Sequence, residues 1–144
     1  MVNYVSDTAA TVAHMPSFSP VEMLDAAAVA AIQRTRLQAQ YRYLWQHSSF
    51  YQRKFRAAGL TPDSVQCVED LARVPFTLKQ ELRDSLKAAP PFGEHLAAPL
   101  SEVIQMQASS GTTGSPSYVA MTKQDALMWQ ESSARSLFAC GIRP

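Results

Sequence analysis

The segment from Ser109 to Ser117 has the residue types best suited to ligand chemistry, because hydroxyl side chains surround two glycines, Gly111 and Gly114. Glycine adopts positive φ and lets the backbone approach a ligand closely, while successive backbone N–H groups and hydroxyls can donate hydrogen bonds to phosphate oxygens. The segment therefore predicts an anion-binding loop. The same composition also makes flexible hairpin connections, and composition alone does not decide between the two.

Two common nucleotide-binding motifs are absent from this segment. A Walker A loop requires lysine after its second glycine, whereas Ser115 follows Gly114 here. The segment does not match the GxGxxG dinucleotide fingerprint either. These departures exclude an ordinary kinase or GTPase P-loop and a dinucleotide-binding turn.

Capping signals and apolar periodicity predict that the residues before this loop are mostly helical, over the region 19–88. Ser19, Pro20 and Glu22 have the spacing of a capping box, and an apolar stripe at helical spacing continues to about His47. Similar signals predict further helices from Ser49 to Ala58, briefly around 68–72, and from Thr77 to about Lys87.

The remaining residues predict a loop over 89–101 and then a strand, a loop, a strand and a helix over 102–144, so the expected fold class is α/β. The strands are expected near 103–106 and 118–121. Thr122 and Asp125 can cap the last helix, and Gly141 can end it. Residues 1–18 lack periodicity and are expected to form a loose N-terminal arm, with one domain over 19–144.

Composition excludes several classes of function. The chain has 144 residues, a formal net charge of +1, 47% hydrophobic and 17% charged residues, as is typical of a soluble globular domain without a general attraction to nucleic acid. Its longest apolar stretch is far shorter than the roughly 20 residues that span a bilayer. Two cysteines without CxxC spacing favour the reducing cytoplasm, and the three histidines are too scattered in sequence to predict a metal site.

An aromatic-rich stretch around Tyr41, Trp45 and Phe55 is interleaved with arginines and permits two interpretations. Such mixtures can stack nucleic-acid bases and bind phosphates. Because Tyr41 and Trp45 continue the apolar helical stripe, we expect these side chains to pack in the core instead.

The order Ser-Ser-Gly-Thr-Thr-Gly-Ser-Pro over 109–116 resembles the phosphate-binding motif of the adenylate-forming enzymes, the acyl-CoA synthetase superfamily. Upstream segments resemble the N-terminal part of phenylacetate-CoA ligase, so that the similarity covers roughly 37–144. The segments that carry it include Phe50-Tyr51-Gln52-Arg53-Lys54-Phe55, Glu69-Asp70-Leu71-Ala72, Val74-Pro75-Phe76-Thr77, Lys79-Gln80-Glu81-Leu82-Arg83 and Pro91-Phe92-Gly93.

The resemblance implies the N-terminal part of the adenylate-forming fold and a reaction in two halves. An aromatic carboxylate attacks ATP to give an acyl-adenylate, and the thiol of coenzyme A then displaces AMP. Mg²⁺ would offset the phosphate charge. Carried over by position, the residues that would hold the β- and γ-phosphates are Ser109, Ser110, Gly111, Thr112, Thr113 and Gly114.

The sequence departs from the family pattern at two positions in this motif. Close relatives usually have lysine after the second glycine, and many superfamily members have it after the proline, but Ser115 and Ser117 occupy these places. The nearest lysine after the loop is Lys123. We therefore expect weaker nucleotide binding than in the lysine-bearing relatives.

Length also bears on activity, because only 27 residues follow Ser117. The family's adenine and acyl pockets, acidic metal-binding segment and C-terminal catalytic lysine would need more chain than this. We expect a truncated piece that is inactive alone and that self-associates through its cut sheet. The alternative is a non-catalytic helical interaction module, or remnant, that retains the loop.

Overall fold

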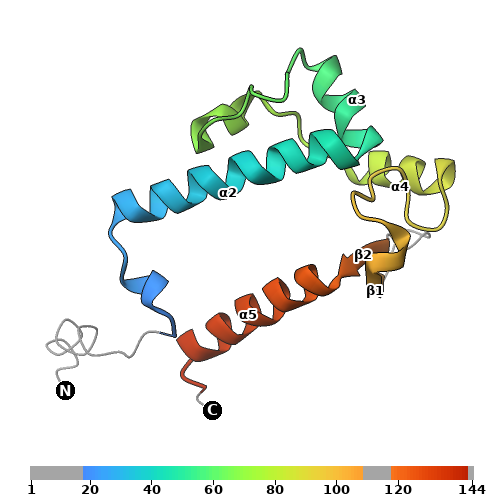
Figure 1. Cartoon of the computed structure of the whole chain (residues 1–144). Coiled ribbons are helices and arrows are strands. Elements are labelled where there is room, and N and C mark those ends of the chain that lie inside the picture. Colours follow the sequence, from blue (N-terminus) through green and yellow to red (C-terminus); the bar gives the residue numbers. More distant parts are fainter. Residues whose placement is uncertain (1–17, 109–117, 143–144) are drawn as a thin grey trace, which may run out of the picture.

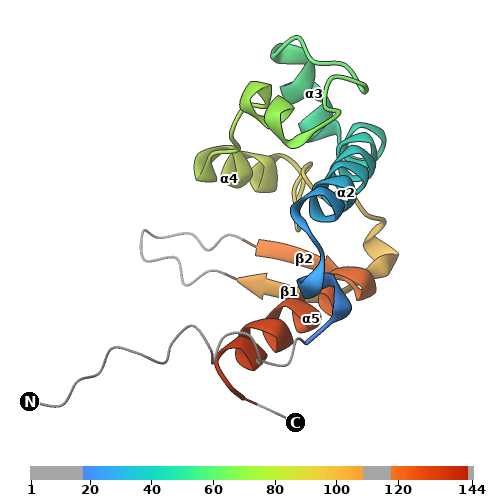
Figure 2. The same ribbon diagram turned by 90° about the vertical axis from the view of Figure 1, so that its left-hand side faces the viewer.

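The computed structural model describes residues 18–108 and 118–142, and the predicted fold class is confirmed: a mostly helical region precedes a β-hairpin and a final helix. The helical region and the hairpin with its helix form two layers (Figures 1 and 2). The chain passes from one layer to the other through residues 89–102, and at the opposite end residues 20–23 lie beside the last helix. In chain order the elements are η1 (Pro20–Met23), α2 (Ala26–His47), α3 (Ser49–Ala57), η2 (Val68–Arg73), α4 (Lys79–Ala88), η3 (Leu100–Glu102), β1 (Val103–Ala108), β2 (Tyr118–Thr122) and α5 (Lys123–Ala139).

The first long helix begins later than the sequence suggested. Ser19 does cap a helical turn, but that turn is the short 3₁₀ helix η1, and Leu24 after it is extended. Asp25 then caps α2 by accepting a hydrogen bond of 2.7 Å from the backbone N–H of Ala28. The prediction of one continuous helix from Ser19 was wrong because Asp25 offers a second, equally good N-cap six residues further on.

The next two helices show similar one-residue shifts. Ser48 rather than Ser49 caps α3, and its side chain accepts from the N–H of Tyr51. In α4 the carboxylate of Glu81 reaches back to the N–H of Leu78 at 2.6 Å, so the N-cap is Leu78 and not the predicted Thr77. A carboxylate is a strong acceptor at the positive end of the helix dipole, which explains why Glu81 makes this hydrogen bond.

The core of the described residues lies where α2 and α3 meet the turn that follows them. Tyr41 and Trp45 project from α2 toward Phe55 of α3, and the Tyr41 and Phe55 ring centroids are 4.8 Å apart. Leu60 and Val65 close the cluster, with Val65 only 1% exposed. Packing in the core, as expected, is therefore the role of the aromatic-rich stretch.

The long loop predicted over 89–101 is fastened to the helical layer. The Tyr43 hydroxyl of α2 donates to the carbonyl of Ala97 at 2.7 Å, and the Ser48 hydroxyl donates to the carbonyl of Glu94 at 3.3 Å. Arg53 of α3 forms an ion pair with the carboxylate of Glu94. These contacts fix the direction from which the chain enters the hairpin.

The hairpin is antiparallel, and α5 packs against both of its strands. Its register pairs Ala108 with Tyr118 and Val103 with Thr122, with an irregularity between Val103 and Gln105. Thr122 then caps α5 in the predicted capping box with Asp125, and Gly141 ends the helix with φ +90°. The hairpin and α5 thus form one strand–strand–helix unit.

Candidate functional site

The hairpin holds the two ends of the candidate phosphate loop together. Ala108, the last residue of β1, is the register partner of Tyr118, the first residue of β2. The segment 109–117 between them therefore leaves and re-enters the sheet at one point. The six predicted phosphate-binding residues, with Ser115 and Ser117, lie in this segment and so outside the described residues: Ser109, Ser110, Gly111, Thr112, Thr113 and Gly114.

The structure places Lys123 relative to the described end of the hairpin at Tyr118. Lys123 is the first residue of α5 and follows β2, whose other end carries Tyr118 next to the loop. Five strand residues at about 3.4 Å each place Lys123 about 17 Å from Tyr118 along the strand. Lys123 thus stands at the far end of β2 from Tyr118, the first described residue after the loop segment.

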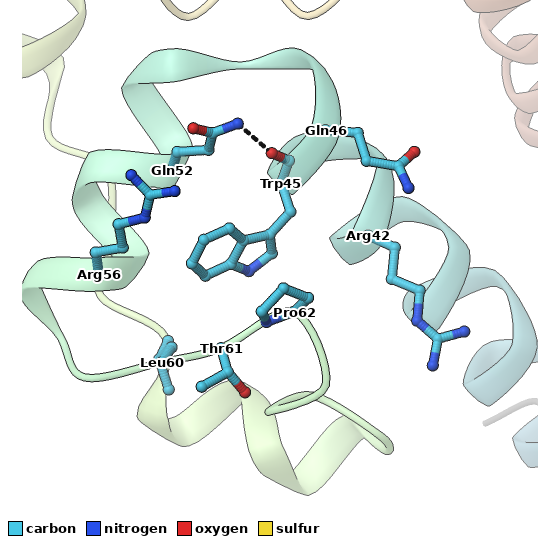
Figure 3. Close-up of a pocket in the computed structure, with 8 residues that line it drawn as sticks. All are labelled: Arg42, Trp45, Gln46, Gln52, Arg56, Leu60, Thr61 and Pro62. Carbon is cyan, nitrogen blue, oxygen red and sulfur yellow. Dashed lines mark hydrogen bonds between the residues drawn. The ribbon is translucent and has the colours of Figure 1, made fainter.

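A cavity of about 540 Å³ opens beside the Trp45 indole (Figure 3). The Arg56 guanidinium lies 5.6 Å from the centre of the indole ring, and Arg42 is paired with Asp63 at 3.1 Å. Both arginines are therefore engaged, and the lining lacks an acid–base or nucleophile–base pair. The lining residues are Arg42, Trp45, Gln46, Gln52, Arg56, Leu60, Thr61 and Pro62.

Gln52 organises this cavity by donating a hydrogen bond from its amide to the carbonyl of Trp45, across the turn between α2 and α3. Among the residues that the structure describes, the buried indole nitrogen of Trp45 has no hydrogen-bond partner. In Figure 3 the indole lies between Gln52 and Arg56 on one side and Pro62 on the other. The side chains around the indole therefore pack against it and do not hydrogen-bond to its nitrogen, so the arrangement serves packing rather than catalysis.

A buried serine–histidine contact was not predicted from the sequence. The Ser85 hydroxyl of α4 accepts from the backbone N–H of His95 at 3.1 Å and lies 2.9 Å from the His95 Nδ1. Burial lowers the pKa of His95, since the charged imidazolium is poorly solvated there. Ser85 is only 4% exposed, so its hydroxyl is inaccessible to a substrate. The pair positions the loop after α4.

Gly93 lets this contact form. Its φ is +82°, and a Cβ at this position would lie 2.6 Å from the His95 ring and 2.9 Å from the Ser85 hydroxyl. Only glycine combines the positive φ with the space that the ring needs. A glycine directly after Pro91 and Phe92 is the one sequence signal that could have indicated the close approach.

No group of three or more His, Cys, Asp or Glu side chains is placed to hold a metal ion in the described part of the chain. None of the helices over 18–108 and 118–142 has the length and apolar character needed to cross a membrane.

Comparison with curated proteins identifies relatives of one kind. The chain is 42% identical over 124 residues to the phenylacetate-coenzyme A ligase of Thermus thermophilus, and 38% identical over 125 residues to that of Escherichia coli. The chain is homologous to the phenylacetate-coenzyme A ligases. These matches take in 86% and 87% of this chain. No family model matches it.

Solved structures of a related ligase share the arrangement of helices and strands seen in this chain. A 2-hydroxyisobutyryl-CoA ligase in complex with 2-HIB-AMP and CoA matches with a TM-score of 0.77 and 38% identity, over 84% of this chain. The same ligase in its postadenylation state matches with a TM-score of 0.76. The helical region, hairpin and α5 therefore correspond to the N-terminal portion of CoA ligase structures.

The chain covers only part of the length of those proteins. It spans 27% of the Thermus ligase, 28% of the Escherichia coli ligase and 26% of the 2-hydroxyisobutyryl-CoA ligase chain. Roughly three quarters of each relative therefore has no counterpart among these 144 residues.

Proposed function

We propose that this chain supplies the nucleotide-phosphate-binding segment of an ATP-dependent aryl-acid CoA ligase, within residues 19–144 of a partial N-terminal domain. The observation that carries the proposal is the 42% identity to a phenylacetate-coenzyme A ligase. The paired strand ends Ala108 and Tyr118 support it, because they hold both ends of the 109–117 segment at one point of the antiparallel hairpin. Sites built on paired strands are positioned better than sites on free loops.

In the proposed reaction, a carboxylate oxygen attacks the α-phosphorus of ATP, and pyrophosphate leaves to give the acyl-adenylate. The thiol of coenzyme A then attacks the acyl carbonyl, and AMP leaves. The part assigned to this chain is to hold the β- and γ-phosphates through backbone N–H groups and hydroxyls, which requires positioning and charge stabilisation rather than covalent chemistry. The residues proposed for this role are Ser109, Ser110, Gly111, Thr112, Thr113 and Gly114.

Mg²⁺ would neutralise phosphate charge in that complex, as it does in phosphoryl-transfer enzymes generally. Hydroxyl and backbone groups of 109–114 would hold the phosphates, and the acidic residues that ligate the metal would come from the rest of the ligase fold. The residues that bind coenzyme A and the catalytic lysine of the family would also come from the rest of the ligase fold.

The acid is proposed to be an aromatic carboxylate, because four phenylacetate-coenzyme A ligases are among the relatives. The 2-hydroxyisobutyryl-CoA ligase is 38% identical over a similar stretch, although its name specifies a different acid. This segment is therefore similar among ligases for different acids. The residues that select the acid are expected in the remaining part of the fold.

Isothermal titration of the full chain with Mg²⁺-ATP tests the proposal, alongside a Thr112→Ala/Thr113→Ala variant. Binding by the wild type and its loss in the variant is the expected result. Gln105→Ala on β1 serves as the matched control, since this exposed polar residue lies on the hairpin outside the loop. Equal binding by all three proteins, or by none, would contradict phosphate binding by this chain and favour the non-catalytic interaction module.

A further inference from the structure

Trp45 has a buried hydrogen-bond donor that lacks an acceptor. The residue is 8% exposed, and no acceptor among the described residues meets its indole N–H. A buried tryptophan N–H usually finds a partner, and a buried polar group without one calls for an explanation such as a bound molecule. In Figure 3 the nitrogen edge of the indole faces Pro62. An acceptor that enters beside Pro62 would satisfy the N–H.

The cavity beside this indole is large enough for a small molecule. Its volume of about 540 Å³ lies within the roughly 300–1,000 Å³ of typical small-molecule sites. Leu60, which is 5% exposed, and Pro62 give the cavity apolar walls in addition to Trp45. Sites of this kind combine apolar walls with a few polar groups that fix the orientation of the ligand.

The charged groups of the cavity favour an anion. Arg42 and Arg56 line it, and none of the described residues that line it is acidic. Arg56 forms no ion pair within the described part of the chain. Arg42 is paired with Asp63, but the two side chains are 51% and 75% exposed. Because exposed pairs contribute little to stability, Arg42 can exchange Asp63 for another anion at small cost.

The surroundings of the indole favour an aliphatic ligand over a flat aromatic one. The Arg56 guanidinium lies 5.6 Å from the centre of the indole ring, and in Figure 3 Pro62 lies on the opposite side of the ring. Both sides of the ring are thus occupied, so a second aromatic ring lacks a face on which to stack. A hydrocarbon chain needs only apolar contact, which Leu60 and Pro62 provide.

We propose that the cavity beside Trp45 binds a medium-chain aliphatic carboxylate. The carboxylate accepts a hydrogen bond from the indole N–H and is neutralised by Arg42 and Arg56, while the hydrocarbon chain lies against Leu60 and Pro62. Pro62 is exposed and belongs to the turn after α3, so it can move outward and admit the carboxylate to the indole nitrogen.

The indole N–H signal of Trp45 in proton–nitrogen correlation spectra of the full chain gives a direct test, with hexanoate as the probe. The chain has two tryptophans, and Trp129→Phe shows which of the two indole signals belongs to Trp45. Hexanoate is expected to shift the Trp45 signal downfield in a saturable manner and to leave that of Trp129 in place. Hexanamide, which lacks the charge, should bind at least about threefold more weakly, because charged acceptors form stronger hydrogen bonds.

Arg42→Gln and Arg56→Gln test the charge of the cavity, and Arg36→Gln is the matched control. Arg36 is another exposed arginine of α2, but it does not line the cavity. Each cavity variant should weaken hexanoate binding by about three- to tenfold, as the loss of one charged hydrogen bond does, while the control stays near wild type. Trp45→Phe removes the donor and keeps a ring, and isothermal titration should show weaker binding to this variant as well.

Three outcomes would overturn the proposal. The first is a Trp45 signal that hexanoate leaves in place. The second is equal affinity for hexanoate and hexanamide, because the charge then has no role. The third is equal weakening by the cavity variants and by Arg36→Gln, which indicates a general attraction of anions to arginine. All the lining residues belong to the helical layer, so a Thr112→Ala/Thr113→Ala variant should bind hexanoate normally and the phosphate loop is tested separately.

Discussion

Arg135 of α5 donates a hydrogen bond of 3.1 Å to the carboxylate of Glu22 in η1, a residue 113 positions earlier in the chain. The same guanidinium bonds Glu131 at 2.7 Å, one turn back in α5, and lies 5.7 Å from the centre of the Phe18 ring. Phe18 in turn packs edge-on against Phe138. One arginine therefore ties the start of the described chain to the last helix.

Replacing Arg135 with Gln is expected to loosen this tie without unfolding the protein. The two charged side chains are 29% and 35% exposed, and partly exposed ion pairs contribute little to global stability. Amide hydrogen exchange should therefore become faster at 20–24 while the Tm changes only slightly. Lys87→Gln, which removes the exposed pair with Asp84, is the control that leaves exchange at 20–24 unchanged. Unchanged exchange in the Arg135 variant would show that the apolar contacts hold the segment alone.

Phe55→Ala is expected to destabilise the helical layer by about 3–5 kcal/mol, because it empties the centre of the core. Phe55 is 3% exposed and contacts both Tyr41 and Trp45. Such a loss is large compared with the roughly 5–15 kcal/mol of a typical domain. Urea unfolding followed by far-UV circular dichroism measures it. Phe55→Leu keeps most of the volume and should cost much less; equal effects of both substitutions would argue against a cavity as the cause.

Local chemistry explains which elements were predictable. Thr122 with Asp125 and Gly59 with its positive φ are short-range signals, and the structure places the start of α5 and the end of α3 there. The start of α2 was misplaced because two residues, Ser19 and Asp25, both have capping chemistry. Sequence cannot rank two valid caps when the outcome depends on where the helix packs.

Long-range contacts account for what the sequence did not reveal. The bond from Tyr43 to Ala97 joins residues 54 positions apart, and that from Arg135 to Glu22 spans 113. No local pattern encodes such pairs. The phosphate loop differs from these contacts, since its residues were predicted from a short local motif. Its six residues lie outside the described structure, and their roles stay a prediction.

His95 gives the stability of the protein a defined dependence on pH. Burial lowers the pKa of His95 below its ordinary value of 6.5, so the unfolded chain binds the proton more readily than the folded one. The contribution is fully present above pH 6.5 and is lost as the pH falls through 6.5 toward the folded pKa. The free energy of unfolding should therefore decrease between pH 7.5 and pH 5.5, at about the physiological range where histidine titrates.

His95→Gln is the variant that isolates this effect, because glutamine does not titrate. Its free energy of unfolding, measured by urea at both pH values, should change less with pH than that of the wild type. The carboxyl groups of Glu69, Asp70 and Glu81 have pKa values lowered from 4.5, 3.8 and 4.5, so they stay ionised across this range. A parallel decrease in the wild type and in His95→Gln would contradict the assignment.

Ser115→Lys is expected to tighten binding of Mg²⁺-ATP to the chain. A lysine ammonium beside the phosphates would add a point charge that serine lacks. Lys123 is the first residue of α5, at the end of β2 remote from Tyr118. Isothermal titration at low ionic strength should give a dissociation constant lower by about three- to tenfold, as a single charged hydrogen bond warrants. The control is Gln124→Lys, which adds the same charge at the start of α5, beyond the far end of β2 from the loop. Tightening by both variants would indicate a general charge effect, and no tightening by Ser115→Lys would show that the missing lysine does not limit nucleotide binding.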